Sequence, residues 1–260
     1  MESFSKKEAL SFAFDTLKGH FWRITGLLFL INLVVFALQI ISEEVKMPLA
    51  LLIIYSVVTW VVGVVASMGF IRFCLAYADN REGNFSDIYS CYPLFWKYLA
   101  SSLLYGLIVF GGMILLIIPG IIWAYKFFFS QYLVIDKGLS PIAALKESSR
   151  ITKGHKWNLF IFSLIFVALL IIAMVPFILM AVASSPLLVG IFLGASVPSR
   201  VAIMISAIIL YMLFIIVFSA FSALSCVYVY RRLLTMNIPS SIPTINPGLS
   251  IDQSKNRPTL

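Results

Sequence analysis

The sequence predicts an all-α fold: a polytopic membrane helix bundle of six transmembrane helices, with amphipathic helices on the cytoplasmic side. The first of three observations behind this prediction is the composition. Of the 260 residues, 61% are apolar and 12% are charged, with a mean hydropathy of +1.02, whereas soluble domains carry roughly 45–50% apolar and about 25% charged residues. So few polar side chains cannot cover a globule in water, which excludes a soluble enzyme, a disordered protein and a disulfide scaffold.

The second observation is a series of long apolar segments. A bilayer core about 30 Å thick needs roughly 20 apolar residues in a helix. One apolar block is too long for a single span, and we expect a tight turn at Pro119 and Gly120 to divide it, because proline breaks the helical hydrogen-bond ladder and glycine tolerates a turn. The predicted spans are 24–41, 49–78, 98–118, 121–135, 157–183 and 201–230.

The third observation is the distribution of charge. The chain has 19 Lys and Arg against 11 Asp and Glu, a net charge of +8. With the N-terminus in the cytoplasm, the basic residues lie on inner segments except for Lys46 and Arg200 in outer loops and Lys126 in the fourth span, in agreement with the positive-inside rule. We therefore expect both termini in the cytoplasm. The basic excess then faces anionic phospholipid headgroups and needs no nucleic-acid partner.

The ends and loops complete the domain organisation. We expect one membrane domain at 1–235 and a disordered cytoplasmic tail at 236–260, which has four prolines and almost no aromatic residues. Residues 1–23 interleave charges with aromatic rings, unlike a cleavable signal peptide, so the first apolar segment is expected to remain as an anchor. The apolar loop at 184–200 is expected either to lie in the interface or to re-enter the membrane.

The segment 9–22 recurs at 144–157, with the same residue at six positions. Each copy precedes an apolar segment, which predicts a parallel internal repeat, with chance similarity as the alternative. Each copy also indicates a short amphipathic helix, at 4–18 and 140–153, and a third, weaker version precedes the third span. Ser5 and Ser140 are the expected N-caps, and Leu10, Phe14, Leu17 and Phe21 are the expected apolar face of the first helix.

Candidate site residues follow from this layout. The cations of the two amphipathic helices are expected to contact lipid headgroups, and polar groups inside a span are functional candidates by default. Gly19 and Gly154 are expected to end the amphipathic helices as left-handed caps, and Trp22 and Trp157 to anchor at the interface. The candidate headgroup contacts are Lys18, Lys146, Arg150, Lys153 and Lys156, and the candidate intramembrane polar residues are Asn32, Gln39 and Lys126.

Catalytic and cofactor signatures are missing from the sequence. No Asp or Glu falls inside a predicted span, no nucleotide-binding glycine motif occurs, and the three cysteines are too scattered for a zinc site. We therefore expect no catalytic residue, metal or cofactor, and no enzymatic activity. Asn32 and Gln39 are also compatible with plain interhelical hydrogen bonds, and Lys126 with a lysine that extends to the interface.

Residues 117–160 resemble a broad, poorly characterised group of bacterial membrane proteins. The resemblance rests on Pro119-Gly120, Asp136, the run from Ala144 to Ser148, and the segment from Thr152 to Trp157. The group includes the YciC-like inner-membrane proteins and the membrane domain found beside some glycerophosphodiester phosphodiesterases. It implies an all-helical protein of the bacterial cytoplasmic membrane and no particular reaction.

The function expected from these observations is that of a non-enzymatic inner-membrane protein in envelope or lipid organisation, or a partner subunit. Its expected partners are the bilayer and its anionic phospholipids, together with another membrane protein or a second copy of the chain. The alternative is a small transporter, or the membrane subunit of one.

Overall fold

The computed structural model describes residues 5–44, 48–83, 87, 90–183 and 197–237. The predicted tail at 236–260 and the loop at 184–200 therefore lie almost entirely outside the described residues. All regular structure in the described part of the chain is helical, which confirms the all-α fold. The elements are α1 (Lys6–Gly19), α2 (Phe21–Glu44), α3 (Leu49–Ala78), η1 (Tyr92–Leu94), α5 (Phe95–Leu115), α6 (Ile117–Phe127), α7 (Ser130–Lys137), α8 (Pro141–Ile151), α9 (Lys156–Ala183) and α11 (Val197–Met236).

Six stretches of helix are long and apolar enough to cross a membrane, and they fit a multi-pass membrane protein. Each corresponds to one predicted span, and the second coincides with its prediction. They are Phe21–Leu38, Leu49–Ala78, Tyr92–Leu115, Ile117–Lys137, Lys156–Ile178 and Ile208–Met236.

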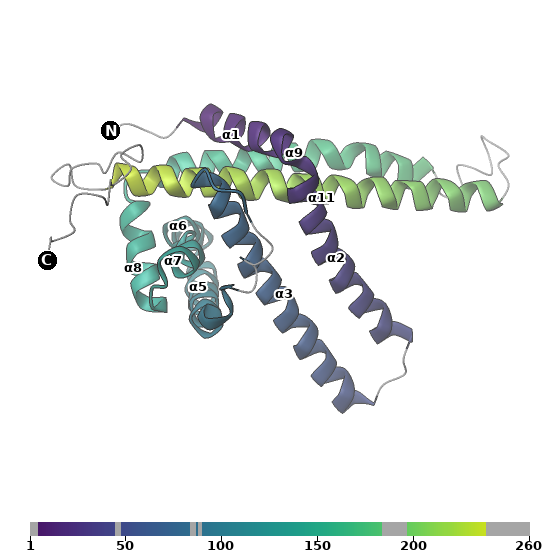
Figure 1. Cartoon of the computed structure of the whole chain (residues 1–260), viewed down its shortest axis with the longest axis horizontal. Helices are drawn as coiled ribbons and strands as arrows, with labels where there is room; N and C mark the ends of the chain where they lie inside the picture. The colour runs from purple at the N-terminus through teal and green to yellow at the C-terminus, as the bar shows by residue number, and fades with distance from the viewer. Residues whose placement is uncertain (1–4, 45–47, 84–86, 88–89, 184–196, 238–260) are drawn as a thin grey trace, which may run out of the picture.

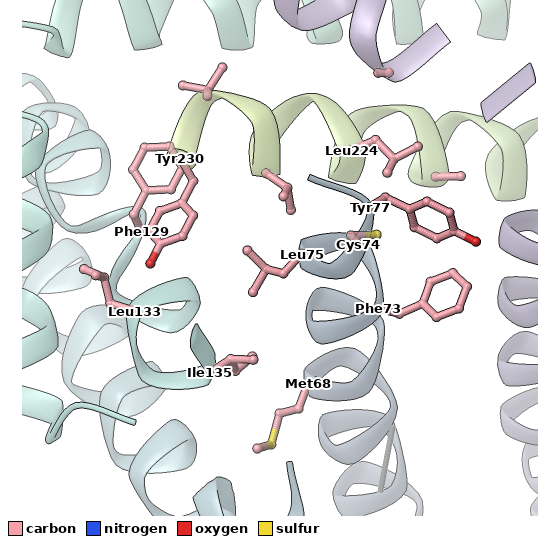
Figure 2. Close-up of a cluster of buried hydrophobic side chains, with 14 of the residues drawn as sticks. Met68, Phe73, Cys74, Leu75, Tyr77, Phe129, Leu133, Ile135, Leu224 and Tyr230 are labelled. Carbon is pink, nitrogen blue, oxygen red and sulfur yellow. The ribbon is translucent and has the colours of Figure 1, made fainter. Parts of the chain in front are cut away.

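The long helices pair into three hairpins, α2 with α3, α5 with α6, and α9 with α11, which diverge from a common region (Figure 1). We call this region the hub; it is formed by the adjoining ends of α3, α7, α8 and α11. Its apolar residues are buried, and Figure 2 shows Phe129 and Tyr230 lying against each other, with ring centroids 5.7 Å apart. Away from the hub most span side chains are exposed, as expected where lipid surrounds a helix.

The predicted turn at Pro119 and Gly120 is wrong by three residues. The chain reverses at Leu116, whose backbone is extended, and Pro119 and Gly120 lie in the first turn of α6. Proline is tolerated there because the first amide groups of a helix have no partner within the helix. Gly120 serves close packing instead. A Cβ atom on it would lie 2.8 Å from the backbone nitrogen of Met113 in α5.

The predicted fourth span is two helices. α6 ends at Phe127 and α7 begins at Ser130, with a turn between them. At 1.5 Å per residue, the 11 residues of α6 reach only about 16 Å, half of a bilayer core.

The two copies of the repeat have buried residues at equivalent positions. Ala9, Ala13 and Leu17 of α1 are buried, and so are Ala144, Ser148 and Thr152 at the equivalent positions in the second copy. Ser5 and Ser140 cap α1 and α8 as predicted, each accepting a hydrogen bond from a backbone amide of the first turn. In the third version of the repeat, residues 84–86 and 88–89 lie outside the described residues, and its second half forms the short helix η1 and the start of α5.

One expectation about the repeat is wrong. Gly154 has the predicted left-handed backbone (φ 85°), whereas Gly19 does not, because only His20 separates α1 from α2 and the chain needs no reversal there. The buried face of α1 differs from its predicted apolar face. Phe14 is 60% exposed, because α1 packs along α11 through its small residues Ala9 and Ala13, which allow the two helices to approach closely.

Candidate functional site

The break between α6 and α7 is the centre of the candidate site. A helix break leaves backbone groups without intrahelical partners, which is costly in a membrane. Here α8 supplies the partners. The Ser148 hydroxyl accepts a hydrogen bond from the Phe129 amide (3.2 Å) and donates one to the Lys126 carbonyl (3.1 Å). The Thr152 hydroxyl donates to the same carbonyl (3.1 Å). Both hydroxyl side chains are fully buried, so α8 is an integral part of the broken span.

Three lysines belong to the segments that meet at this break. The Thr152 hydroxyl binds the backbone carbonyl of Lys126, Lys153 follows Thr152 in the chain, and Lys156 begins α9. Tyr125, next to Lys126, contacts the second turn of α9, where its ring lies 5.8 Å from that of Phe160. Among the described residues none of the three lysines has a carboxylate partner within 4.0 Å. The ammonium of Lys126 lies 4.9 Å from the Phe127 ring. The break therefore carries a local excess of positive charge.

The guanidinium of Arg150, predicted as a headgroup contact, is hydrogen-bonded to other groups of the protein. It donates two hydrogen bonds to Glu147 (2.8 and 2.7 Å) and one to the Asn237 carbonyl (3.2 Å). This pairing lowers the pKa of Glu147 below its ordinary value, because the hydrogen bonds from Arg150 favour the carboxylate. Arg150 thus joins α8 to the end of α11.

An apolar cavity of about 160 Å³ adjoins the break. Tyr125, Phe128 and Phe129 line it from the broken span, and α9 and α11 close the other sides. The hydroxyls of Tyr125 and Ser163 share a hydrogen bond at its edge. Trp157, which is 70% exposed, stacks on Phe160 at 5.2 Å. The break therefore combines cations, an exposed indole ring and an apolar recess.

An ionic cluster holds the three hairpins together at the hub. Arg231 of α11 forms a two-pronged pair with Asp136 of α7 (2.8 Å for each contact) and a further bond with Asp79 at the end of α3 (2.8 Å). Tyr230 also donates to Asp136 (2.8 Å). None of the three residues is among the candidate site residues predicted from the sequence. The available signal was a charged residue near the end of each hairpin's return segment, Asp79, Asp136 and Arg231, which are two acids and one base that can pair.

A second polar region lies between α2 and α3. An open groove of about 510 Å³ is lined by one face of α3, including Ser56, Thr59 and Ser67, and by Val35 of α2. The buried Thr59 hydroxyl has no hydrogen-bond partner in the part of the chain that the structure describes. From Ser67 a chain of contacts leads to Tyr98 (3.5 Å), which donates to Gln131 (3.3 Å). This region could accept a polar group within the membrane.

The remaining predicted residues are dispersed. Asn32 donates to the Leu28 carbonyl of its own helix (2.8 Å), so this bond is intrahelical and not the interhelical one named as the alternative. The side chain of Gln39 lies outside what the structure describes. Lys18 and Lys146 are exposed and, among the described residues, have no ion-pair partner. Trp22 is 85% exposed at the start of α2, and Trp157 is 70% exposed next to Lys156 at the start of α9.

The fold and the site together define a class: a multi-pass, all-α membrane protein with a broken span buttressed by a short helix. Residues 107–193 match the model of a family described as "Protein of unknown function (DUF975)". The match runs from α5 through the break and α8 into α9, so it includes Ser148, Thr152 and the three lysines at the break. No curated protein and no solved structure matches the chain.

Proposed function

We propose that this chain is a non-enzymatic integral protein of the bacterial cytoplasmic membrane that organises lipid or envelope components. The observation that carries the proposal is a set of three exposed cations, Lys18, Lys146 and Lys153, which have no carboxylate partners among the described residues. We call these residues the basic surface. Exposed Trp22 and Trp157 accompany them. Indole rings favour the membrane interface, and lysines near it attract anionic headgroups.

The proposed orientation places the basic surface, the hub and both termini in the cytoplasm. It is supported by the distribution of Lys and Arg and by tryptophans in the first turns of the incoming helices α2, α5 and α9. Fusions of a fluorescent protein that matures only in the cytoplasm to each end of the chain test it. Both fusions should fluoresce in bacterial cells, and a dark C-terminal fusion with intact expression would contradict the six-span topology.

A non-enzymatic role is supported by the state of the carboxylates near the spans. Asp79 and Asp136 lie together, an arrangement that could serve acid–base chemistry, but Arg231 engages both. Their pairing is suited to holding helices in place. Kinship with the YciC-like proteins and with the phosphodiesterase-associated membrane domain is part of this proposal. So is association with another membrane protein or a second copy of the chain.

Charge reversal tests the lipid role. The variant Lys18→Glu, Lys146→Glu, Lys153→Glu should co-purify several-fold less anionic phospholipid in mild detergent than the wild type, measured by mass spectrometry of extracted lipids. The matched control is Lys46→Glu, Arg200→Glu, which reverses the basic residues of the predicted outer loops and should leave the lipid content unchanged. Equal lipid content in all three proteins would refute the proposal.

The second candidate is a small transporter, favoured by the groove between α2 and α3 with its unpartnered Thr59 hydroxyl. In a background without the three native cysteines, Ser56→Cys and Thr59→Cys should react with a membrane-impermeant thiol reagent if the groove holds water. Ile54→Cys, exposed on the same helix but not lining the groove, is the control. If Ser56→Cys and Thr59→Cys react no faster than Ile54→Cys, the transport path through this groove is excluded.

A further inference from the structure

We infer that the break between α6 and α7 is a binding site for one anionic phospholipid, with the phosphate on Lys126, Lys153 and Lys156 and part of an acyl chain in the adjoining apolar cavity. This inference rests on the proposed function and makes it specific, since a general basic surface would attract many lipids loosely. Here one headgroup and one chain would be held by a defined set of side chains.

The charge at the break is the first argument. The Ser148 and Thr152 hydroxyls bind the backbone carbonyl of Lys126 and hold this residue against the end of α8. Lys153 and Lys156 follow Thr152 closely in the chain, so the three lysines lie on segments that meet at the break. Other cations at the hub are already paired: Arg231 with Asp136, and Arg150 with Glu147. The three lysines are not paired with any described carboxylate. A phosphate group would supply the missing counter-charge.

The surroundings argue for a lipid rather than a free anion. Tyr125, next to Lys126 in the chain, lines the 160 Å³ cavity, whose walls are almost entirely apolar and aromatic. This volume has room for a few methylene groups. Trp157 is exposed beside Lys156 and stacks on Phe160, a position from which an indole ring can contact the glycerol region. The lysines and the apolar cavity thus lie next to each other, as the phosphate and the acyl chains do in a phospholipid.

Quenching of Trp157 fluorescence by brominated lipids tests the inference. The other four tryptophans are replaced by Phe, and the protein is reconstituted into vesicles of phosphatidylcholine containing a small fraction of brominated phosphatidylglycerol or brominated phosphatidylcholine. We expect Trp157 to be quenched with at least tenfold preference for phosphatidylglycerol. The variant Lys126→Gln, Lys153→Gln, Lys156→Gln should lose this preference. The control Lys6→Gln, Lys7→Gln, Arg232→Gln removes the same charge elsewhere on the basic side and should keep it within twofold.

Further variants and competitors distinguish a phospholipid site from a loss of folding and from simple anion binding. The substitution Lys126→Arg, Lys153→Arg, Lys156→Arg should keep the preference, which distinguishes lost charge from lost folding. Filling the cavity with Ser222→Leu should weaken binding several-fold, whereas Ser219→Leu, on the same helix and outside the cavity, should not. Inorganic phosphate and deacylated glycerophosphoglycerol should compete at least tenfold more weakly than short-chain phosphatidylglycerol.

The outcomes also separate this inference from the proposed function. If the wild type has no preference for phosphatidylglycerol, both fail. If the preference exists but the variant at the break and the control lose it equally, the basic surface is general and only the defined site is wrong. If inorganic phosphate competes as well as the lipid, the lysines bind an anion and the lipid assignment is wrong.

Discussion

Helices α5 and α6 approach each other closely at Gly112 and Gly120. A Cβ atom on Gly120 would lie 2.8 and 2.9 Å from the backbone nitrogen and Cα of Met113, and backbone atoms cannot move aside as a flexible side chain can. We expect Gly120→Ala to destabilise the protein by about 1–3 kcal/mol, the usual cost of overpacking. The thermal unfolding midpoint in detergent measures this effect.

Gly106→Ala is the matched control for that substitution. Gly106 lies on α5 with nothing within 4 Å of its added Cβ, so the variant should be neutral or slightly stabilised, because alanine favours a helix over glycine by up to about 1 kcal/mol. Equal midpoints for the two variants would mean that the α5–α6 contact is looser than described.

Arg231 is the second residue with a defined energetic role. Its removal leaves Asp136 partly buried without a counter-charge and leaves Asp79 with only Arg81, 3.6 Å away. Breaking a buried pair on one side costs about 3–5 kcal/mol. Because the Arg231 side chain is 26% exposed, we expect about 2–3 kcal/mol for Arg231→Ala, measured as a lowered unfolding midpoint. Adding Asp136→Asn to Arg231→Ala should recover part of the lost stability, because it removes the unpaired carboxylate. Arg232→Ala, on the exposed side of α11, should have little effect, and an equal loss there would argue against the ionic cluster.

Among the elements, α8 has the most informative role, because it was predicted as a surface helix and instead completes a broken span. Ser148→Ala with Thr152→Val leaves the Lys126 carbonyl and the Phe129 amide without these partners, at an expected cost of about 2–4 kcal/mol for the pair of substitutions. Hydrogen exchange of residues 126–130 should accelerate at the same time. Ser149→Ala, one position away, should change neither quantity, and unchanged exchange in the double variant would place the support of the break elsewhere.

For the whole molecule, stability should be concentrated at the hub, since the hairpins diverge beyond it (Figure 1). Leu224 is fully buried at the hub and Leu210, on the same helix α11, is 53% exposed. We expect Leu224→Ala to cost about 2–4 kcal/mol, because a cavity in a packed region loses van der Waals contacts that lipid cannot replace. Leu210→Ala should cost under about 1 kcal/mol. Comparable losses in unfolding midpoint would contradict a stability centred on the hub.

The site could be foreseen in parts and not as a whole. The sequence pointed to Lys126, Lys153 and Lys156 separately, because a lysine within an apolar span and a helix rich in basic residues can both be recognised from the sequence. It also overestimated Arg150, whose partner Glu147 lies three positions earlier but whose bond to the Asn237 carbonyl joins residues far apart in the chain. The cap at Gly19 was wrong because a Lys-Gly-His sequence does not reveal that α2 begins only one residue after α1. The sequence also did not reveal that α1 packs along α11 with Ala9 and Ala13 buried.

By itself the sequence determined the helical class, the six apolar spans, the N-caps Ser5 and Ser140, and the repeated segment. These depend on local composition, on period and on the length needed to cross a bilayer, which neighbouring residues alone encode. Only the tertiary structure decided that the chain reverses at Leu116, that α8 supports the break before Ser130, and that Arg231 joins Asp79 and Asp136. Each of these is a pairing between residues distant in the chain, whose free energy depends on how the hairpins meet at the hub.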